Sequence, residues 1–399
     1  MPEGIQRMRV KLSNSALAIA AAVFAFPAAA QQPKRIIDVG PPFEVELVAD
    51  LQEPWALAFL PDGRMLVTEK RGALHVVTQD GQVSPAIAGV PAVTYNVHGG
   101  LGDVVLHPDF ARNRLIYLTW AEAGDGGTSG AAMGRGRLNP DATRLENFEV
   151  IWRQSPKVAQ ERHYSYRMAF SPDGQHLFVT SGDRWTPETA QNNADNLGSV
   201  LRLTPDGKAA PGNPLYENGG LAAEMWAYGI RSPVGIAFDA KGELWEVEMG
   251  PRGGDEFQKI ERGANYGWPL VSYGDEYRGG NIPGHDTRPD LRAPEEYWNP
   301  VISPTSMIFY SGDLFPDWRG SALIAGLTSK ALIRVTFQCT LAFRTICEAE
   351  RFPLGGRLRE VEQGPDGAVW VLEDGGKDDP AAGRLMRLTP RPKVPSTMR

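Results

Sequence analysis

One pattern recurs along this chain: an alternating run of apolar residues, a turn of the Pro-Asp-Gly type, and a second alternating run. Clear copies cover residues 56–67, 168–179, 235–245 and 362–371, and looser copies surround residues 108–110 and 316–318. Proline presets φ for the first corner of a turn, aspartate hydrogen-bonds its own backbone, and glycine supplies positive φ, so each copy predicts a β-hairpin. Hairpins repeated every few dozen residues indicate a repeat architecture, because one hairpin cannot bury its apolar face alone.

The repeat predicts an all-β fold, a six-bladed β-propeller of four-stranded antiparallel blades. Residues 383–388 are predicted to form a last strand that pairs with N-terminal residues and closes the ring, which leaves no free sheet edge. No linker divides the mature region, so residues 31–399 are expected to form a single catalytic domain. Functional residues of a closed propeller lie in loops at one end of its central channel, so we expect the site in those loops.

Composition narrows the possible functions. The chain has 399 residues, 42% of them hydrophobic, with 44 Gly and 32 Pro, which suits a large and turn-rich β core. Its formal net charge of -7 argues against a nucleic-acid-binding protein, which would carry a basic surface. No apolar run in the mature region reaches the length of a membrane-spanning helix.

The N-terminus has the features of an export signal peptide. Arg7 and Lys11 belong to a positively charged segment, residues 16–26 are apolar, and a small-residue stretch ends at Ala30. We therefore expect residues 1–30 to be a signal peptide cleaved near Ala30, and the protein to be periplasmic or secreted.

Export would place the two cysteines, Cys339 and Cys347, in an oxidising compartment. Two positions that face one another across a hairpin lie within disulfide reach, so a bond between them is predicted. A pair of free buried thiols is the alternative.

Four stretches carry polar residues that strand packing does not explain. The first contains His163, directly before a predicted inner strand and without apolar neighbours. A histidine in this position can act as a general base near neutral pH. An imidazole in a solvated loop is the alternative.

The second stretch, residues 248–256, is a glycine-rich loop. Gly250 and Pro251 expose backbone carbonyls, and Asp255 and Glu256 add carboxylates. Hard oxygen ligands in an irregular loop suit Ca²⁺, although the spacing is not that of an EF-hand. A tight turn with solvated acids is the alternative.

The other two stretches carry arginines. Arg231 precedes another predicted inner strand, while Arg357 and Arg359 alternate along one strand and so point to the same face. Paired arginines can bind carboxylates bidentately, or can simply cover a solvated strand face. None of the four stretches has a His/Cys metal spacing, a Gly-x-Ser-x-Gly elbow or a phosphate-binding loop.

In this order, the stretches resemble the soluble pyrroloquinoline quinone (PQQ)-dependent sugar dehydrogenases, in particular the periplasmic aldose sugar dehydrogenases. The resemblance spans residues 43–390, and its most specific parts are segments 98–104, 248–256, 265–269 and 355–361. It implies a six-bladed propeller in which PQQ lies across the top of the channel, together with bound Ca²⁺.

The resemblance also implies roles for individual residues. His163 matches the catalytic base, and Arg231 matches the arginine beside the reactive quinone carbonyl. The other matches are the cofactor-binding residues Tyr277, Arg357 and Arg359, the carbonyls of Gly250 and Pro251 on the cofactor-bound Ca²⁺, and Glu256 and Tyr266 on a further Ca²⁺.

Several cofactor-site positions depart from the family pattern. His98 and Ser232 stand where the best-known members have glutamine and asparagine, and Tyr166 stands where small residues are usual and is expected to narrow the substrate space. The lysine that contacts PQQ aligns with Thr328, and Lys330 is expected to point the same way two residues further along a strand. These departures bear on PQQ affinity and sugar choice more than on the fold.

The function that the resemblance implies is oxidation of aldose sugars at the anomeric carbon to lactones by an exported enzyme. His163 would take the hydroxyl proton, hydride would pass to PQQ, and an external electron acceptor would follow. The chain is expected to be a monomer or a weak homodimer. Two alternatives come from other classes: a catalytically inactive propeller that serves as a binding module, and a Ca²⁺-dependent lactonase-type hydrolase.

Overall fold

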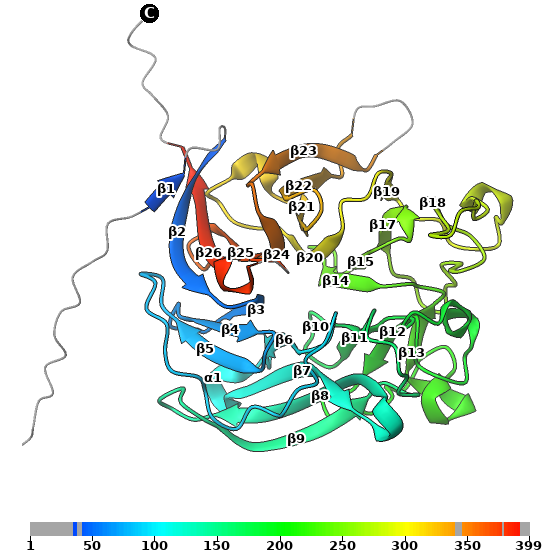
Figure 1. Ribbon diagram of the computed structural model, residues 1–399, viewed down its shortest axis with the longest axis horizontal. Coiled ribbons are helices and arrows are strands. Elements are labelled where there is room, and N and C mark those ends of the chain that lie inside the picture. The colour runs from blue at the N-terminus through cyan, green and yellow to red at the C-terminus, as the bar shows by residue number, and fades with distance from the viewer. Residues whose placement is uncertain (1–34, 38–41, 340–344, 377–378, 392–399) are drawn as a thin grey trace, which may run out of the picture. The chain divides into compact units, whose positions relative to one another are not determined.

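The computed structural model describes residues 35–37, 42–339, 345–376 and 379–391, so the predicted signal peptide lies outside the described residues. Within these residues, six short strands line the centre, each in contact with the next around a closed ring (Figure 1). They are β3 (Pro54–Phe59), β6 (Leu101–Leu106), β10 (Ser165–Phe170), β14 (Pro233–Phe238), β20 (Pro304–Phe309) and β24 (Arg357–Gln363).

Each inner strand begins an antiparallel blade that runs outward in sequence order. Four blades are four-stranded in the described chain, with orders β6-β7-β8-β9, β10-β11-β12-β13, β14-β15-β17-β19 and β20-β21-β22-β23. Their outer strands are β7 (Leu115–Ala123), β8 (Ser129–Leu138), β9 (Leu145–Arg153), β11 (Leu177–Ser181), β12 (Ser199–Leu203), β13 (Met225–Tyr228), β15 (Leu244–Glu248), β17 (Asp255–Lys259), β19 (Glu296–Trp298), β21 (Ala322–Gly326), β22 (Ala331–Thr336) and β23 (Cys347–Pro353).

The first and last blades differ from this pattern. The first contains β3, β4 (Met65–Glu69) and β5 (Ala73–Val77), and its outermost pairing is reduced to a bridge between Val77 and Val83. In the last blade, β24, β25 (Val369–Asp374) and β26 (Gly383–Pro390) are joined by β2 (Phe43–Leu51) and β1 (Arg35–Ile37) from the N-terminal side. Because β2 pairs with β26, strands from the N- and C-terminal sides of the described chain close the ring, as predicted. The six-bladed propeller is confirmed.

The predicted hairpin turns join inner strands to their neighbours. Gly63, Gly174, Gly242 and Gly367 have φ values of 85°, 68°, 78° and 84°, the positive values that their turns require. The two looser copies form short helices instead, α1 (Phe110–Asn113) and η6 (Pro316–Trp318), which connect β6 to β7 and β20 to β21. The remaining short elements are η1 (Asp125–Gly127), η2 (Pro187–Gln191), η3 (Tyr216–Asn218), η4 (Gly220–Glu224), β16 (Arg252–Gly253), β18 (Gly274–Asp275), η5 (His285–Thr287) and η7 (Pro380–Ala382).

The hydrophobic core lies between adjacent blades. Leu57 and Val67 of the first blade pack with Trp370 and Leu372 of the last, for example, and all four are almost fully buried. Burial of each such side chain contributes about 1.5–3 kcal/mol, so closure of the ring is stabilised by packing as well as by the β2–β26 ladder.

A single charged side chain ties the inner strands together at the centre. Arg167 of β10 forms ion pairs with Asp103 of β6 and Glu360 of β24. Its guanidinium also donates to the carbonyls of Val234 on β14, at 3.0 Å, and Thr305 on β20, at 2.7 Å. The Trp55 ring of β3 lies 4.0 Å away. Arg167 therefore touches the other five inner strands.

Each inner strand is also irregular near its start. All six show a register shift against the second strand of the blade within their first few residues. Such bulges twist a strand and re-aim its side chains, and they are common beside active sites. The starts of the inner strands are therefore where side chains are directed toward one end of the channel.

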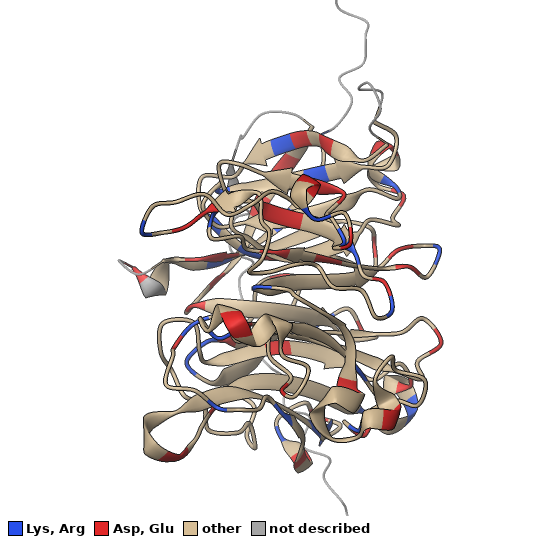
Figure 2. Ribbon diagram, turned by 90° about the vertical axis from the view of Figure 1, so that its right-hand side faces the viewer, with Lys and Arg blue, Asp and Glu red and all other residues tan. Residues whose placement is uncertain are grey.

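Two further predictions concern the periphery. Cys339 and Cys347 form a disulfide, with Cα atoms 5.8 Å apart, so the predicted bond is confirmed. In the side view, acidic and basic residues are interspersed along the strands and loops (Figure 2). Among the described residues, none of the helices is long and apolar enough to cross a membrane.

Candidate active site

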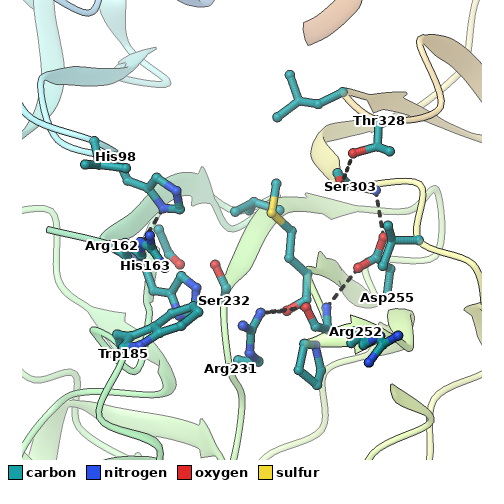
Figure 3. A pocket seen from close by; sticks show the side chains of 18 of the residues that line it. His98, Arg162, His163, Trp185, Arg231, Ser232, Arg252, Asp255, Ser303 and Thr328 are labelled. Atoms are coloured by element: carbon teal, nitrogen blue, oxygen red, sulfur yellow. Dashed lines mark hydrogen bonds between the residues drawn. The ribbon is translucent and has the colours of Figure 1, made fainter. Parts of the chain in front are cut away.

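A cavity of about 980 Å³ opens at the end of the channel where the inner strands begin. Its wall is built by inner-strand starts and loops from all six blades. Figure 3 shows His98, His163 and Trp185 on one side, Ser303 and Thr328 on the opposite side, and Arg231 between them. Of the residues predicted from the sequence, those that line the cavity are His98, His163, Arg231, Ser232, Gly250, Pro251, Tyr277, Thr328, Arg357 and Arg359.

Three predicted site residues lie elsewhere. Lys330 is exposed and outside the lining, so the expectation that it points the same way as Thr328 is wrong. The physical reason is that both belong to the turn between β21 and β22, where Lys330 has a φ of 51° and strand alternation does not hold. Glu256 and Tyr266 line a second, small cavity of about 10 Å³, which shares Arg231, Gly250 and Pro251 with the main one.

His163 is buried, with 5% of its side chain exposed, and is not a solvated loop imidazole. Its Nδ1 lies 2.7 Å from Asp183 Oδ1. Asp183 is fixed in turn by the backbone N–H of Trp185, at 2.9 Å, and the indole N–H of Trp268, at 2.8 Å. Gly182 permits this approach, because a Cβ there would lie 2.2 Å from the His163 carbonyl oxygen.

The electrostatics of this pair favour a neutral imidazole. Burial lowers the pKa of His163, the nearby Arg231 lowers it further, and Asp183 opposes both. Burial raises the pKa of Asp183, but His163 and Arg231 more than offset this effect, so its pKa lies below the ordinary value. Asp183 is therefore ionised and accepts the Nδ1 proton, which leaves Nε2 of His163 as a proton acceptor.

His98 adds a second neutral imidazole to the same wall. Its Nδ1 accepts the backbone N–H of His163 at 3.3 Å, and the two ring centroids are 5.9 Å apart. Burial, followed by repulsion from His163, lowers the pKa of His98 to about 3. Because Nδ1 accepts a hydrogen bond, Nε2 carries the proton. Tyr166, which also lines the cavity, packs against Trp55 with ring centroids 5.3 Å apart.

Arg231 is buried at the base of the cavity. Its Nη1 donates to the carbonyls of Met249 and Gly250, both at 2.7 Å. Its backbone N–H donates to Glu248 Oε2 at 2.7 Å, and the N–H of Ser232 donates to the same oxygen at 3.2 Å. The guanidinium position is therefore set by the loop that follows β15.

The side chain of Asp255 fixes the 250–254 loop through hydrogen bonds to backbone N–H groups. One carboxylate oxygen accepts the N–H of Gly250 at 2.9 Å, and the other accepts those of Ile302 and Ser303 at 2.8 and 2.7 Å. Burial raises the pKa of Asp255 to about 7, with the three N–H groups opposing. Asp255 thus binds backbone groups and supports the loop, and the carbonyls of Gly250 and Pro251 lie at the cavity.

The carbonyls of Gly250 and Pro251 fit a Ca²⁺ whose other ligands come from a bound molecule. They do not enclose the ion by themselves. In the described part of the chain, no group of three or more His, Cys, Asp or Glu side chains is placed to hold a metal ion. The hydroxyl of Tyr266 donates to the Lys259 carbonyl and accepts the Glu261 N–H at 2.9 Å, so only its backbone carbonyl would be a ligand. Carbonyl and carboxylate oxygens are nevertheless the donors that Ca²⁺ prefers.

Arg357 and Arg359 point to the same side of β24, as predicted, and share one acid. Arg357 Nε lies 2.8 Å from Asp374 Oδ1, and Arg359 Nε lies 3.0 Å from Asp374 Oδ2. Two guanidinium groups thus face one carboxylate at the cavity wall. Ser165 Oγ, also in the lining, is buried and has no hydrogen-bond partner among the described residues. Surplus positive charge and a spare hydroxyl suit a bound polycarboxylate such as PQQ.

Sequence reasoning missed three parts of this site. Asp183 was not paired with His163, and Lys70 and Trp185 were not recognised as lining residues. The signal for Asp183 was its position directly after β11, at the same end of the blade as His163. Trp185 stacks with Tyr277 at 5.4 Å, and the Arg162 guanidinium lies 4.6 Å from the Trp185 ring.

Comparisons with known proteins agree with the fold and the cavity. The sequence matches the glucose/sorbosone dehydrogenase family over residues 51–387, and the chain belongs to this family. It is 38% identical over 357 residues to the aldose sugar dehydrogenase YliI of Escherichia coli, covering 87% of this chain and 93% of the relative.

Solved structures give the same result. The soluble aldose sugar dehydrogenase of Escherichia coli, in its apo form, superposes with a TM-score of 0.81 at 38% identity, covering 88% of this chain and 100% of the other. The PQQ-bound aldose sugar dehydrogenase of Streptomyces coelicolor superposes with a TM-score of 0.70 at 26% identity, covering 87% and 98%. The resemblance to soluble PQQ-dependent sugar dehydrogenases is confirmed, and with it the enzyme class.

Proposed function

We propose that this chain is an exported enzyme that oxidises aldoses at the anomeric carbon to lactones, with PQQ and Ca²⁺ as cofactors. The observation that carries the proposal is the position of the His163–Asp183 pair in the same cavity as Arg231, Arg357 and Arg359. The cavity therefore holds a proton acceptor together with cations that can bind an anionic group. Oxidation with a carboxylated cofactor requires both.

His163 is the proposed base. Its Nε2 would accept the proton of the anomeric hydroxyl, while Asp183 stabilises the imidazolium that forms and keeps the ring in position. Arg231 would hold negative charge at the base of the cavity, where two carbonyls and flanking aromatic rings fix its guanidinium.

The cofactors would supply the remaining chemistry. When bound, PQQ would supply a hydride acceptor and Ca²⁺ would supply a Lewis acid. Arg357 and Arg359 would bind carboxylates of PQQ, and Gly250 and Pro251 would offer backbone carbonyls to Ca²⁺. An external electron acceptor would be needed to complete the turnover. The aldose sugar dehydrogenase of Escherichia coli supports aldoses as substrates, and the PQQ-bound form of the Streptomyces coelicolor enzyme supports PQQ as the cofactor.

The test is reconstitution of the purified mature chain with PQQ and Ca²⁺, followed by dye reduction across a panel of aldoses and their deoxy analogues. We expect PQQ-dependent reduction with aldoses, lactone as product, and loss of turnover in His163→Ala. Lactone hydrolysis without dye reduction would favour the hydrolase, and sugar binding without turnover would favour the binding module.

A further inference from the structure

Lys70 brings an unexpected cation to the cavity. It follows β4, at the turn into β5 of the first blade, and lines the main cavity. It also lines an adjoining cavity of about 70 Å³ together with Arg357, Arg359 and Asp374 of the last blade. Two segments far apart in the sequence therefore place three cationic side chains at one end of the site.

The ammonium group of Lys70 is held in place without a carboxylate. Its Nζ donates to the carbonyls of Asn96 and Val97, both at 3.0 Å. An ammonium has three N–H donors, so one remains for a further acceptor. No ion pair joins Lys70 to an acid of the described chain, and the nearby Glu53 already contacts Arg71 and Tyr95, each at 2.9 Å.

The charge balance around Lys70 is positive. Asp374 forms ion pairs with both Arg357 and Arg359. Among the described residues, it is the one carboxylate in direct contact with the group that Lys70 and these two arginines form. Burial, followed by repulsion from Arg359, lowers the pKa of Lys70 to about 8. In the turn after β21, where the family resemblance places a lysine, Thr328 instead forms a neutral hydrogen bond with Ser303 at 2.6 Å.

We propose that Lys70 is a third cationic contact for the carboxylates of bound PQQ, acting with Arg357 and Arg359. This inference rests on the proposed function, since it concerns the same cofactor site. In this chain the first blade supplies the additional positive charge, because the turn after β21 contributes only the uncharged residues Leu327 and Thr328 to the cavity lining.

The test measures PQQ affinity of the full mature chain in the presence of Ca²⁺, by titration of cofactor fluorescence, with no turnover required. Lys70→Met removes the charge. Lys70→Gln also removes it but keeps an amide that can donate to the carbonyls of Asn96 and Val97. We expect both variants to bind PQQ roughly 10- to 100-fold more weakly, the scale of a hydrogen bond to a charged group. Lys70→Arg should bind nearly as tightly as the wild type. Lys241→Met, a change of equal charge on the exposed β14–β15 turn, should have no effect.

The dependence of affinity on pH provides a second readout. The charged and titratable groups that face Lys70 are Glu53, Arg71, Tyr95, His98, Arg359 and Asp374. Between pH 7 and 9 His98 stays neutral, because burial lowers its pKa to about 3, and burial raises the pKa of Tyr95 above its usual value. Burial also acts on Asp374, but Arg359 and Arg357 more than offset it and hold the pKa of this acid below its usual value. Because only the charged form of Lys70 attracts an anion, wild-type affinity should fall roughly tenfold over that range. In Lys70→Arg it should stay flat.

Wild-type affinity in Lys70→Gln would overturn the proposal and leave Lys70 as a support for the 96–98 segment only. A flat pH dependence in the wild type would also contradict it. If the wild type binds no PQQ, the proposed function itself fails, which is a different result. Melting temperatures of all variants show that each is folded before its affinity is compared.

Discussion

Nδ1 of His163 and Oδ1 of Asp183 lie 2.7 Å apart, and this hydrogen bond determines which ring nitrogen is available to accept a proton. Asp183 is itself held by the N–H groups of Trp185 and Trp268, so its carboxylate has little freedom to move. The imidazole is thereby fixed in orientation and tautomer before a substrate arrives. This arrangement follows the logic of acid–histidine pairs in which the acid positions the base and stabilises its charged form.

Removal of the Asp183 charge should therefore slow the reaction but leave PQQ bound. We expect Asp183→Asn to lower turnover by roughly 10²–10⁴ in PQQ-loaded enzyme, because the imidazolium loses its counter-charge. Loss of the carboxylate also lowers the pKa of His163 further, so the acid limb of the kcat/KM profile should move to lower pH. Asp290→Asn, at an exposed ion pair with Arg288, is the matched control. An unchanged acid limb would contradict the role.

His163→Ala tests the base directly. Turnover should fall by roughly 10²–10⁴, the usual contribution of a general base, while folding and PQQ affinity are retained. In the wild type the acid limb should lie below the ordinary histidine pKa, because burial and Arg231 both disfavour the charged ring. Steady-state kinetics with saturating PQQ measure the first effect and a pH series the second. Near wild-type turnover in the loaded variant would reject the assignment.

The sequence predicted those parts of the molecule that depend on local pattern. Gly63 and Gly174 marked hairpin turns because positive φ is a local requirement. His163 and Arg231 stood out because each directly precedes an inner strand. Asp183 did not, because the one signal was its place just after β11, and its contact with His163 depends on how two adjacent segments approach each other.

The positions of two other residues, Lys330 and Lys70, could not be predicted correctly from local sequence pattern. Lys330 was expected to alternate with Thr328 along a strand, but Lys330 has a positive φ within a turn and does not line the cavity. Lys70 was overlooked because its partners, Arg357 and Arg359, lie almost 300 residues away and meet it only when the ring closes. Contacts between the first and last blades are therefore the least predictable part of this site.

Arg357 and Arg359 are predicted to bind carboxylates of PQQ. Replacement of either by Ala should weaken binding by roughly 1.5–3 kcal/mol, the scale of a hydrogen bond to a charged group. The remaining arginine should keep Asp374 paired, so the fold should be maintained. Titration of the apo protein with PQQ measures the effect, and Arg112→Ala at an exposed ion pair serves as the control. Unchanged affinity in both variants would reject the role.

Calcium should stabilise the protein as well as support its activity. An ion that binds only the native state adds RT ln(1 + [L]/Kd), roughly 2.7 kcal/mol at a hundredfold excess over Kd. Chelation should therefore lower the melting temperature and abolish PQQ-dependent activity, and added Ca²⁺ should restore both. Glu256→Gln should lose the thermal shift of the second ion and keep part of the activity, because Gly250 and Pro251 would bind Ca²⁺ through their backbones. If exhaustive chelation changes neither stability nor PQQ binding, the 248–256 loop is only a turn.

The last prediction concerns Arg167, which holds the inner strands together beneath the cavity. Burial raises the pKa of Asp103 and brings that of Glu360 to about 7, and in both cases Arg167 opposes the shift. Arg167→Met would leave these acids without their counter-charge and should destabilise the fold by roughly 3–5 kcal/mol. Carboxyls with raised native pKa values bind more protons when folded than when unfolded, so the stability of the variant should fall as pH rises through this range. Urea unfolding at pH 5.5 and pH 8 should therefore show the larger deficit at pH 8, whereas Leu57→Ala, a buried substitution that removes no titrating group, should show a deficit independent of pH. A deficit below about 1 kcal/mol, or one that shrinks as pH rises, would mean that Arg167 is not what holds these strands together.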